Sequence, residues 1–284
     1  MVMAAPFQSI TIGALRITYV PDGYGLLKPT GLFPTTRETD WQDYQHFLDK
    51  QGQLVGSVGA HVIQTPKHTL LVDTAYGPGD FEGPIVTLHG GAFLQNLKKA
   101  GIDPADIDTV FFTHLHFDHV GWTGQIVDGQ PILTFPNARF LVRSTEWHRF
   151  DDPAESRAGI EVALNLLAQR IELIEDGAHI LPEATVLATS GHTPGHASLL
   201  LTAGKERAIV LGDVFHSSIQ FEHPEWTNGL DSDPERAKRT RHQMLQELAQ
   251  PDTLGIGTHI ADSVFGRLTS VQDKYQWSVE QPER

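Results

Sequence analysis

The sequence predicts a layered α/β protein, in which short strands alternate with helices. Short β-prone runs and segments with helical spacing follow one another along most of the chain, which favours helices packed on sheets. The 26 glycines and 17 prolines are enough to divide 284 residues into many short elements. Polar residues follow several of the predicted strands, so we expect the functional site at strand ends.

The first part of the chain predicts strands on either side of an irregular segment. Residues 10–20 partly alternate apolar and polar side chains, which indicates a strand pair. Residues 25–57 are irregular, with a short helix expected at 41–50. The runs 60–64 and 69–73 predict a hairpin whose turn contains a proline.

The middle of the chain predicts a helix followed by a buried strand. Residues 92–100 have helical spacing and end at Gly101, where glycine can adopt the left-handed conformation that closes a helix. Residues 109–113 are β-prone and largely apolar, and they lead directly into a cluster of histidines.

The second half repeats this alternation of strands and helices. Residues 139–142 predict a strand, Ser144 is a candidate N-cap of a short helix, and residues 160–171 have helical spacing. Further strands are expected at 185–189, 197–202, 208–211 and 253–257, with a long helix at 234–249.

The composition limits the chemistry. The chain has a formal charge of −14, and it contains 15 histidines but no cysteine. The lack of cysteine excludes a disulfide framework, a thiolate nucleophile, a cysteine-ligated zinc site and the usual iron–sulfur clusters. The acidic balance argues against binding nucleic acid. Any metal must therefore be held by histidine and carboxylate.

The length suits one large domain, and we take residues 1–284 as a single unit. No run approaches the roughly 18 apolar residues of a membrane span, and the first residues do not form a signal peptide. We expect a cytoplasmic protein by default, and a processed exported form is left open. The expected partner is a small-molecule substrate, without nucleic acid or membrane, and a homodimer is left open.

The strongest signal is the run His114-Leu115-His116-Phe117-Asp118-His119, which follows the apolar strand at 109–113. Side chains two apart at a strand end point the same way, so His114 and His116 can bind one metal ion together. If the chain then turns, Asp118 and His119 can face a second metal position. Imidazole and carboxylate suit zinc, and also iron, manganese or cobalt. The alternative is a chance histidine-rich loop, which the preceding strand disfavours.

Residues 113–121, THLHFDHVG, resemble the signature THxHxDHxG of the metallo-β-lactamase-fold hydrolases. Other motifs of that superfamily follow in the expected order, with Ala75 where a glycine is more usual. These motifs are Leu71-Val72-Asp73-Thr74, Gly191-His192-Thr193-Pro194-Gly195-His196, Leu211-Gly212-Asp213 and Gly257-Thr258-His259. The resemblance implies a four-layer αββα sandwich with two metal ions at one edge, between the two sheets.

The resemblance also implies the ligands of two divalent metal ions, zinc in the first place. The first metal would be held by His114, His116 and His192, and the second by Asp118, His119 and His259. Asp213 would bridge the two metals. Asp73 resembles the carboxylate that supports the site from below, and His196 is expected to be a loop or supporting residue. The other histidines outside these motifs, namely His46, His61, His68, His89, His148, His179, His223 and His242, are expected at the surface or partly buried.

His216 follows the bridging position by three residues. The related lactonases often carry a tyrosine there, so histidine looks more like the phosphotriesterase and broad-specificity branch. A structural role is the alternative to a hydrogen bond with substrate. Nearby aromatic residues could form an apolar wall for an acyl chain or an aromatic leaving group, with core packing as the alternative; they are Phe117, Trp122, Phe215, Phe221 and Trp226.

The expected reaction is hydrolysis by a hydroxide that bridges two metal ions, with Asp118 or His216 delivering a proton to the leaving group. No serine-nucleophile elbow, P-loop or dinucleotide fingerprint competes. The resemblance favours a lactonase acting on N-acyl-homoserine lactones, as in quorum quenching. His216 and residues 219–221 favour an organophosphate triester or aryl ester as the next candidate. A glutathione thioesterase and a ribonuclease are disfavoured, and β-lactam hydrolysis is left open.

A di-iron redox protein is the hypothesis from another class. Such relatives usually carry a glutamate where this chain has His116, and a flavin domain for which 284 residues leave no room. A non-enzymatic binding module is the last alternative.

Overall fold

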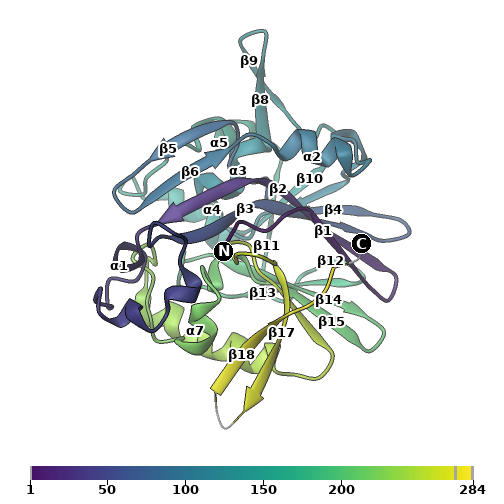
Figure 1. Ribbon diagram of the computed structural model, residues 1–284. Helices are drawn as coiled ribbons and strands as arrows, with labels where there is room; N and C mark the ends of the chain where they lie inside the picture. Colours follow the sequence, from purple (N-terminus) through teal and green to yellow (C-terminus); the bar gives the residue numbers. More distant parts are fainter. Residues whose placement is uncertain (1, 272–273, 283–284) are drawn as a thin grey trace.

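The computed structural model describes residues 2–271 and 274–282 of the chain. Within these residues two large mixed sheets pack face to face, and helices cover their outer sides (Figure 1). The strands of the first sheet lie between Gln8 and Ile174, and those of the second sheet follow from His179 onward. The sequence-based expectation of an αββα sandwich is confirmed.

The first sheet contains the strands that lead to most of the predicted ligands. In the described residues its order is β11-β10-β7-β4-β3-β2-β6-β5, with β1 paired to β2. Around β7 the pairing is parallel, and in most of the remainder it is antiparallel. The strands are β1 (Gln8–Ile12), β2 (Leu15–Leu27), β3 (Leu54–Gln64), β4 (Thr69–Val72), β5 (Gly79–Glu82), β6 (Val86–Gly90), β7 (Thr109–Phe111), β10 (Arg139–Arg143) and β11 (Ile171–Ile174).

The second sheet follows the chain in order, from β12 to β18. Its strands are β12 (His179–Leu181), β13 (Ala184–Ala188), β14 (Ala197–Ala203), β15 (Glu206–Val210), β16 (Thr253–Ile256), β17 (Phe265–Val271) and β18 (Lys274–Val279). A separate hairpin of β8 (Gly124–Val127) and β9 (Gln130–Leu133) projects from the body (Figure 1).

The helices are short except for α7, whose amphipathic face lies on the second sheet. The α-helices are α1 (Pro29–Leu32), α2 (Phe93–Lys99), α3 (Phe117–Val120), α4 (Ser144–His148), α5 (Glu161–Leu167), α6 (Ile219–Glu222) and α7 (Pro234–Leu248). The 3-10 helices are η1 (Asp40–Gln42), η2 (Gln45–Phe47), η3 (Pro104–Asp106), η4 (Gly121–Thr123), η5 (Arg149–Asp151) and η6 (Gly212–Val214). Among the described residues, no helix combines the length and the apolar character needed to cross a membrane.

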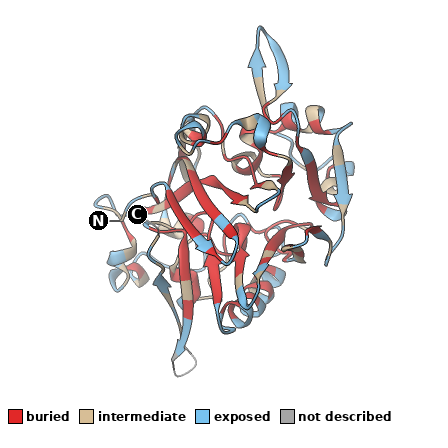
Figure 2. Cartoon of the chain, turned by 90° about the vertical axis from the view of Figure 1, so that its right-hand side faces the viewer, coloured by how far each residue is buried: buried red, intermediate tan, exposed pale blue. Residues whose placement is uncertain are grey.

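Alternation of side chains along the strands produces the four layers. On β7, Phe111 joins the hydrophobic cluster between the two sheets, whereas Val110, and Phe112 directly after the strand, join the cluster under the outer helices. On β15, Val210 faces the first sheet and Ile209 faces α7. The central strands of both sheets are therefore buried on both sides, and Figure 2 shows many strand segments in the buried colour, whereas the projecting hairpin is exposed.

Most expected elements are confirmed, and three are wrong. The helix expected at 41–50 is replaced by the turns η1 and η2, which Trp41 anchors in a cluster with Phe33. The helix expected at 160–171 ends at Leu167, because the chain then enters β11. Ser144 is not an N-cap: it lies inside α4, and its hydroxyl donates to the Glu175 carboxylate.

His61 is fully buried, which contradicts the expectation of a surface or partly buried histidine. It lies on the central strand β3, and its ring packs against the buried ring of Tyr19 on β2 at a centroid distance of 5.4 Å. Nearly every residue of β3 is buried, so the strand has no exposed face on which His61 could lie. This burial follows from the pairing of β3 with its neighbouring strands, which the sequence alone does not show. Burial lowers the pKa of His61 from 6.5 to about 3.

Burial of neutral His61 makes the folded state sensitive to acid. Below pH 6.5 the His61 ring becomes protonated in the unfolded chain, whereas in the folded chain it stays neutral down to about pH 3. The free energy of unfolding therefore decreases as the pH is lowered from 6.5 to about 3. Between neutral pH and about pH 5, we expect the free energy of unfolding to fall by roughly 2 kcal/mol less in His61→Leu than in wild type. Urea unfolding measured at both pH values tests this.

The exposed histidine variant His148→Leu is the matched control and should follow the wild-type pH profile. Parallel profiles for wild type and His61→Leu would show that His61 is not held neutral by burial.

Candidate metal centre

The predicted ligands meet at one edge of the sandwich, where loops from both sheets converge. His114 and His116 follow β7, and Asp118 and His119 lie in the single turn of α3. The other three come from the second sheet: His192 lies between β13 and β14, Asp213 in η6 after β15, and His259 after β16.

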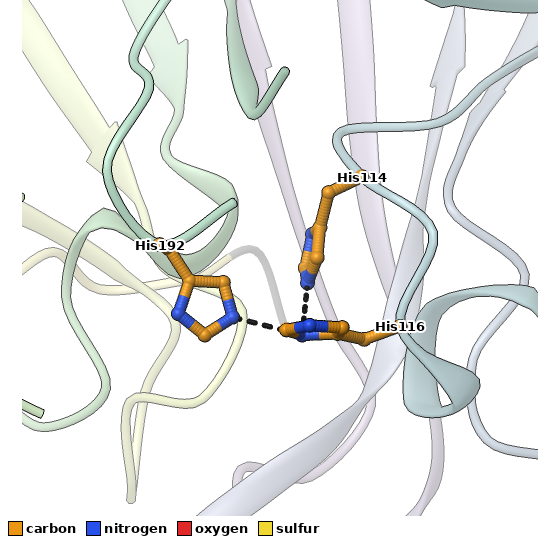
Figure 3. Close-up of side chains that lie close together, drawn as sticks. All are labelled: His114, His116 and His192. Atoms are coloured by element: carbon orange, nitrogen blue, oxygen red, sulfur yellow. Dashed lines mark hydrogen bonds between the residues drawn. The ribbon is translucent and has the colours of Figure 1, made fainter. Parts of the chain in front are cut away.

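His114, His116 and His192 form the first cluster (Figure 3). The Nδ1 atom of His116 lies 3.0 Å from Nε2 of His114 and 2.9 Å from Nε2 of His192. Three imidazole nitrogens bound to one tetrahedral zinc would lie roughly 3.3 Å apart. The three rings therefore converge about as closely as a shared cation requires.

Asp118, His119 and His259 form the second cluster. The Oδ2 atom of Asp118 lies 3.9 Å from Nε2 of His119 and 3.7 Å from Nε2 of His259. These distances are too long for hydrogen bonds but suit separate bonds to one central cation.

Asp213 lies between the two clusters and turns one oxygen to each. Its Oδ1 is 3.2 Å from Nε2 of both His119 and His259, whereas its Oδ2 is 3.4 Å from Nε2 of His192. Gly212 permits this placement, because it has a φ of +56° and a Cβ there would lie 2.6 Å from Nε2 of His196.

Hydrogen bonds to Nδ1 orient three of the rings and leave their Nε2 atoms facing inward. His119 bonds to Oδ2 of Asp73 at 2.8 Å, and His259 to the carbonyl oxygen of Ser57 at 2.9 Å. His192 bonds to Oδ1 of Asp231 at 3.2 Å. Such contacts fix the tautomer of a metal-binding imidazole and raise its basicity.

The polar atoms of this edge fit a divalent cation. Nε2 of His119 and Oδ1 of Asp213 are buried and form no hydrogen bond, although they lie within 3.2 Å of one another. Both atoms therefore point at a third position rather than at each other. A buried carboxylate oxygen without a partner is costly, and a bound cation would satisfy it.

The pKa values of the histidines shift in opposite senses in the two clusters. Burial lowers the pKa of His114 and His116 well below the ordinary value. Burial opposes protonation of His259 as well, but the carboxylates of Asp213 and Asp118 together outweigh it and raise that pKa to about 9. Against the effect of burial, the carboxylates of Asp213, Asp73 and Asp118 together raise the pKa of His119 well above its usual range. The second cluster therefore attracts positive charge.

Asp73 supports the site from below, as its motif predicts. It accepts hydrogen bonds from the backbone and hydroxyl of Thr113, besides the one from His119. Asp73 and Ala75 both have a positive φ, 60° and 51°. This conformation gives a physical reason why glycine is the more usual residue at position 75 in the family that the motifs resemble.

His196 is buried beside Asp213 and outside the ligand clusters. Its Nε2 accepts a hydrogen bond of 2.9 Å from the backbone N–H of Asp213, and its Nδ1 bonds to Thr189. Burial lowers the pKa of His196 to about 3. The imidazole is therefore neutral, and it holds Asp213 by its backbone.

His216 and Asp118 face a cavity of about 300 Å³ beside the clusters. Nε2 of His216 lies 3.2 Å from Oδ2 of Asp213, and neither ring nitrogen has a hydrogen-bond partner. Much of the remaining lining of the cavity is apolar and comes from Leu27, Val58, Phe81, Ile85, Val86 and Leu88.

Of the aromatic residues expected to form an apolar wall, Phe117 alone lines this cavity. Trp122, Phe215 and Phe221 are buried in the cores under the outer helices, and Trp226 packs on Trp41 at a centroid distance of 5.3 Å. The wall comes instead from β2, β3 and the β5–β6 hairpin, whose residues carry no motif.

Asp231 is a supporting residue that the sequence did not reveal. Besides His192, it contacts the buried guanidinium of Arg241 on α7, at 3.2 Å between Oδ2 and Nη1. Arg241 links this carboxylate to the core of the second sheet. Nothing in the spacing of Asp231 marks it, because it joins His192 only through the fold.

Glu146 is a second supporting residue without a sequence signal. It is fully buried on α4, and its carboxylate accepts hydrogen bonds from the backbone N–H of Leu115 and Gly195 and from the hydroxyl of Thr193. Leu115 separates His114 from His116, and Thr193 follows His192. Glu146 therefore joins the two loops that make up the first cluster.

The Asp231 contact predicts a selective effect on one metal position. Asp231→Asn keeps the size of the side chain but removes the negative charge that stabilises His192. We expect the affinity for one metal ion to fall about 10–100-fold, with the other little changed. Competition with a chelator, followed by metal analysis, measures the two affinities.

The matched control is Asp233→Asn, which alters the exposed N-cap of α7 two residues away and should leave both affinities unchanged. If Asp231→Asn lowers thermal stability but leaves the ratio of the two metal affinities unchanged, Asp231 has only a structural role.

Comparison with known proteins agrees with this geometry. The family model described as the metallo-beta-lactamase superfamily matches residues 53–254. An N-acyl homoserine lactonase of Bacillus sp is 28% identical over 190 residues, which are 62% of this chain and 71% of the relative. Metallo-beta-lactamase domain-containing protein 1 of Xenopus laevis is 30% identical over 199 residues, 70% of each chain.

Solved structures extend the similarity to nearly the whole chain. A hydrolase of the beta lactamase superfamily, AbOPH, superposes with a TM-score of 0.85 at 27% identity, over 99% of both chains. AidC, described as a dizinc quorum-quenching lactonase, superposes with a TM-score of 0.82 at 22% identity, also over 99% of both chains, and it supports the fold. The chain is a hydrolase that belongs to the metallo-beta-lactamase superfamily.

Proposed function

We propose that the whole chain, residues 1–284, is one hydrolase domain that opens the ester bond of lactones, most specifically N-acyl-homoserine lactones. The observation that carries this proposal is the cavity, because its lining combines residues of the ligand cluster with a set of apolar side chains. A substrate with a polar ring and an apolar acyl chain matches both parts of this lining. The lactonase relative from Bacillus sp supports the same substrate class.

Two divalent metal ions, zinc in the first place, complete the proposed site. His114, His116 and His192 would hold one ion, Asp118, His119 and His259 the other, and Asp213 both. When bound, these ions supply a water nucleophile that is deprotonated near neutral pH and stabilise negative charge on the substrate oxygen. The quorum-quenching lactonase AidC is described as a dizinc enzyme, which supports the choice of zinc.

Asp118 and His216 are the proposed catalytic side chains. Both line the cavity next to the ligand cluster, where they can reach a bound ester. Burial lowers the pKa of His216, so its ring is neutral at pH 7 and offers one N–H to the substrate. Asp118 has a partly exposed carboxylate, which could accept the proton that the attacking water gives up and pass it to the leaving alkoxide.

Hydrolysis of an organophosphate triester or an aryl ester is the second candidate, and His216 favours it. This side chain stands at the cavity, where a tyrosine is more usual among related lactonases. The neighbouring residues 219–221 do not line the cavity; Gln220 instead accepts a hydrogen bond of 2.7 Å from the backbone N–H of His216. Gln220 would therefore position His216 for either substrate.

Metal analysis tests the proposed site. We expect close to two ions per chain, lost together with activity on chelation and restored together by zinc. A colourless protein after purification would support zinc, whereas iron content with visible absorbance would favour the di-iron redox alternative. One tightly held ion per chain would contradict the two-metal proposal.

Asp213→Ala tests the shared ligand. Because each Asp213 oxygen faces a different cluster, we expect both ions to bind at least about tenfold more weakly. His148→Ala, which changes an exposed histidine outside the site, should retain both ions. Unchanged occupancy in Asp213→Ala would show that Asp213 is not a bridge.

A substrate panel separates the candidate reactions. We expect the highest kcat/KM with N-acyl-homoserine lactones, lower values with simple lactones and an aryl ester, and the lowest with a phosphotriester and a β-lactam. We expect this preference because an acyl chain can contact the apolar side chains that line the cavity. Highest activity on the phosphotriester would instead establish the second candidate.

A further inference from the structure

The floor of the apolar cavity is formed by two glycines that face each other across neighbouring strands. Gly25 of β2 pairs with Gly56 of β3, and Leu88 of β6 pairs with Gly25 on its other side. All three line the cavity. Because cross-strand partners share one face of a sheet, this row presents bare backbone to the cavity beside one leucine.

The backbone conformation does not require glycine at either position. Neither Gly25 nor Gly56 has a positive φ. Both lie inside strands, where glycine is less stable than alanine because its backbone loses more freedom on folding. A glycine inside a strand without such a requirement often marks a place where a ligand approaches the backbone.

Steric crowding does not require these glycines either. A Cβ on Gly56 would lie 3.3 Å from the Cδ1 tip of Leu27, and one on Gly25 would lie 2.9 Å from the Cδ2 tip of Leu88. Both neighbours are the ends of flexible side chains. By contrast, a Cβ on Gly23 or Gly59 of the same two strands would lie 1.7 Å or 2.5 Å from a backbone oxygen.

The space left by the two glycines adjoins the candidate metal centre. The Cβ position of Gly56 is 3.9 Å from the carbonyl oxygen of His259. The flanking residues of the same sheet face, Leu27, Val58 and Val86, are all apolar. A group that rests on this floor must be apolar and slender, and it must continue from a polar group at the ligand cluster.

We propose that Gly25 and Gly56 determine substrate specificity by admitting an unbranched alkyl chain over the bare backbone of β2 and β3. This inference rests on the proposed ester-hydrolase function, and it assigns the acyl chain of the substrate to a defined part of the sheet. The two glycines determine which lengths of alkyl chain fit in the cavity, whereas the ligand cluster binds the ester group.

Gly56→Val tests the proposal, because its branched side chain would fill the floor. With N-butanoyl-, N-octanoyl- and N-dodecanoyl-homoserine lactone, we expect kcat/KM for the longest chain to fall at least about tenfold and that for the shortest less than about threefold. Gly56→Ala and Gly25→Ala should give smaller losses in the same order. Each variant is first shown to retain the metal content of the wild type.

Val55→Leu is the matched control, since it enlarges the adjacent residue on the opposite face of β3 and should not change the chain-length profile. An unchanged profile in Gly56→Val would overturn the proposal. Equal losses for all chain lengths would also overturn it, because they would show that the new side chain disturbs His259 rather than the chain.

Failure of the proposed function has a different signature. If wild type turns over none of the lactones, the proposed function is wrong. Binding of decanoate, measured by calorimetry, then tests separately whether an alkyl chain binds over Gly25 and Gly56. Binding by wild type that is weakened at least about tenfold in Gly56→Val supports the alkyl-chain site, and absence of binding by wild type overturns it.

Discussion

The Asp213 carboxylate is the point on which the rest of the site depends. It is buried, and its two oxygens face imidazoles that come from β7, β15, β16 and the loop before β14. A buried carboxylate is stable only where positive charge or donors surround it. The sandwich meets this requirement by bringing loops from both sheets to one edge, so the position of Asp213 constrains the relative placement of the sheets at that edge.

Much of the fold around this edge supplies the contacts that keep the ligands aimed inward. Asp73 lies under His119, Asp231 behind His192, and Glu146 between the two loops of the first cluster. Each is a buried carboxylate that belongs to a different element. Hydrogen bonds to these buried carboxylates therefore hold the ligands in place. They also hold the helices α3 and α4, which are too short to be stable without such contacts.

The sequence was most informative where the chemistry is local. Residues 114–119 carry four candidate ligands within six residues, and the motifs around His192, Asp213 and His259 follow strands. The resemblance of these motifs to the metallo-β-lactamase signature implied both the αββα layers and the ligand set. The structure confirms the layers, and the ligand set stays a prediction. Asp231 and Glu146 could not be predicted, because their partners lie 39 and 31 residues away and no periodicity connects them. The prediction that His61 is exposed or partly buried was wrong for the same reason, because its burial follows from the pairing of its strand with the strand of Tyr19.

The reaction and the choice of substrate depend on different physical features of one cavity. Imidazoles and carboxylates on loops form the polar part of its lining, and they respond to charge and protonation. Strand residues of the first sheet form much of the apolar part, where a missing side chain changes shape without changing charge. A loop position shifted by a fraction of an ångström alters the cation site, but a methyl group added to β3 mainly removes volume. Substrate range can therefore change in this fold through single strand residues while the metal chemistry is preserved.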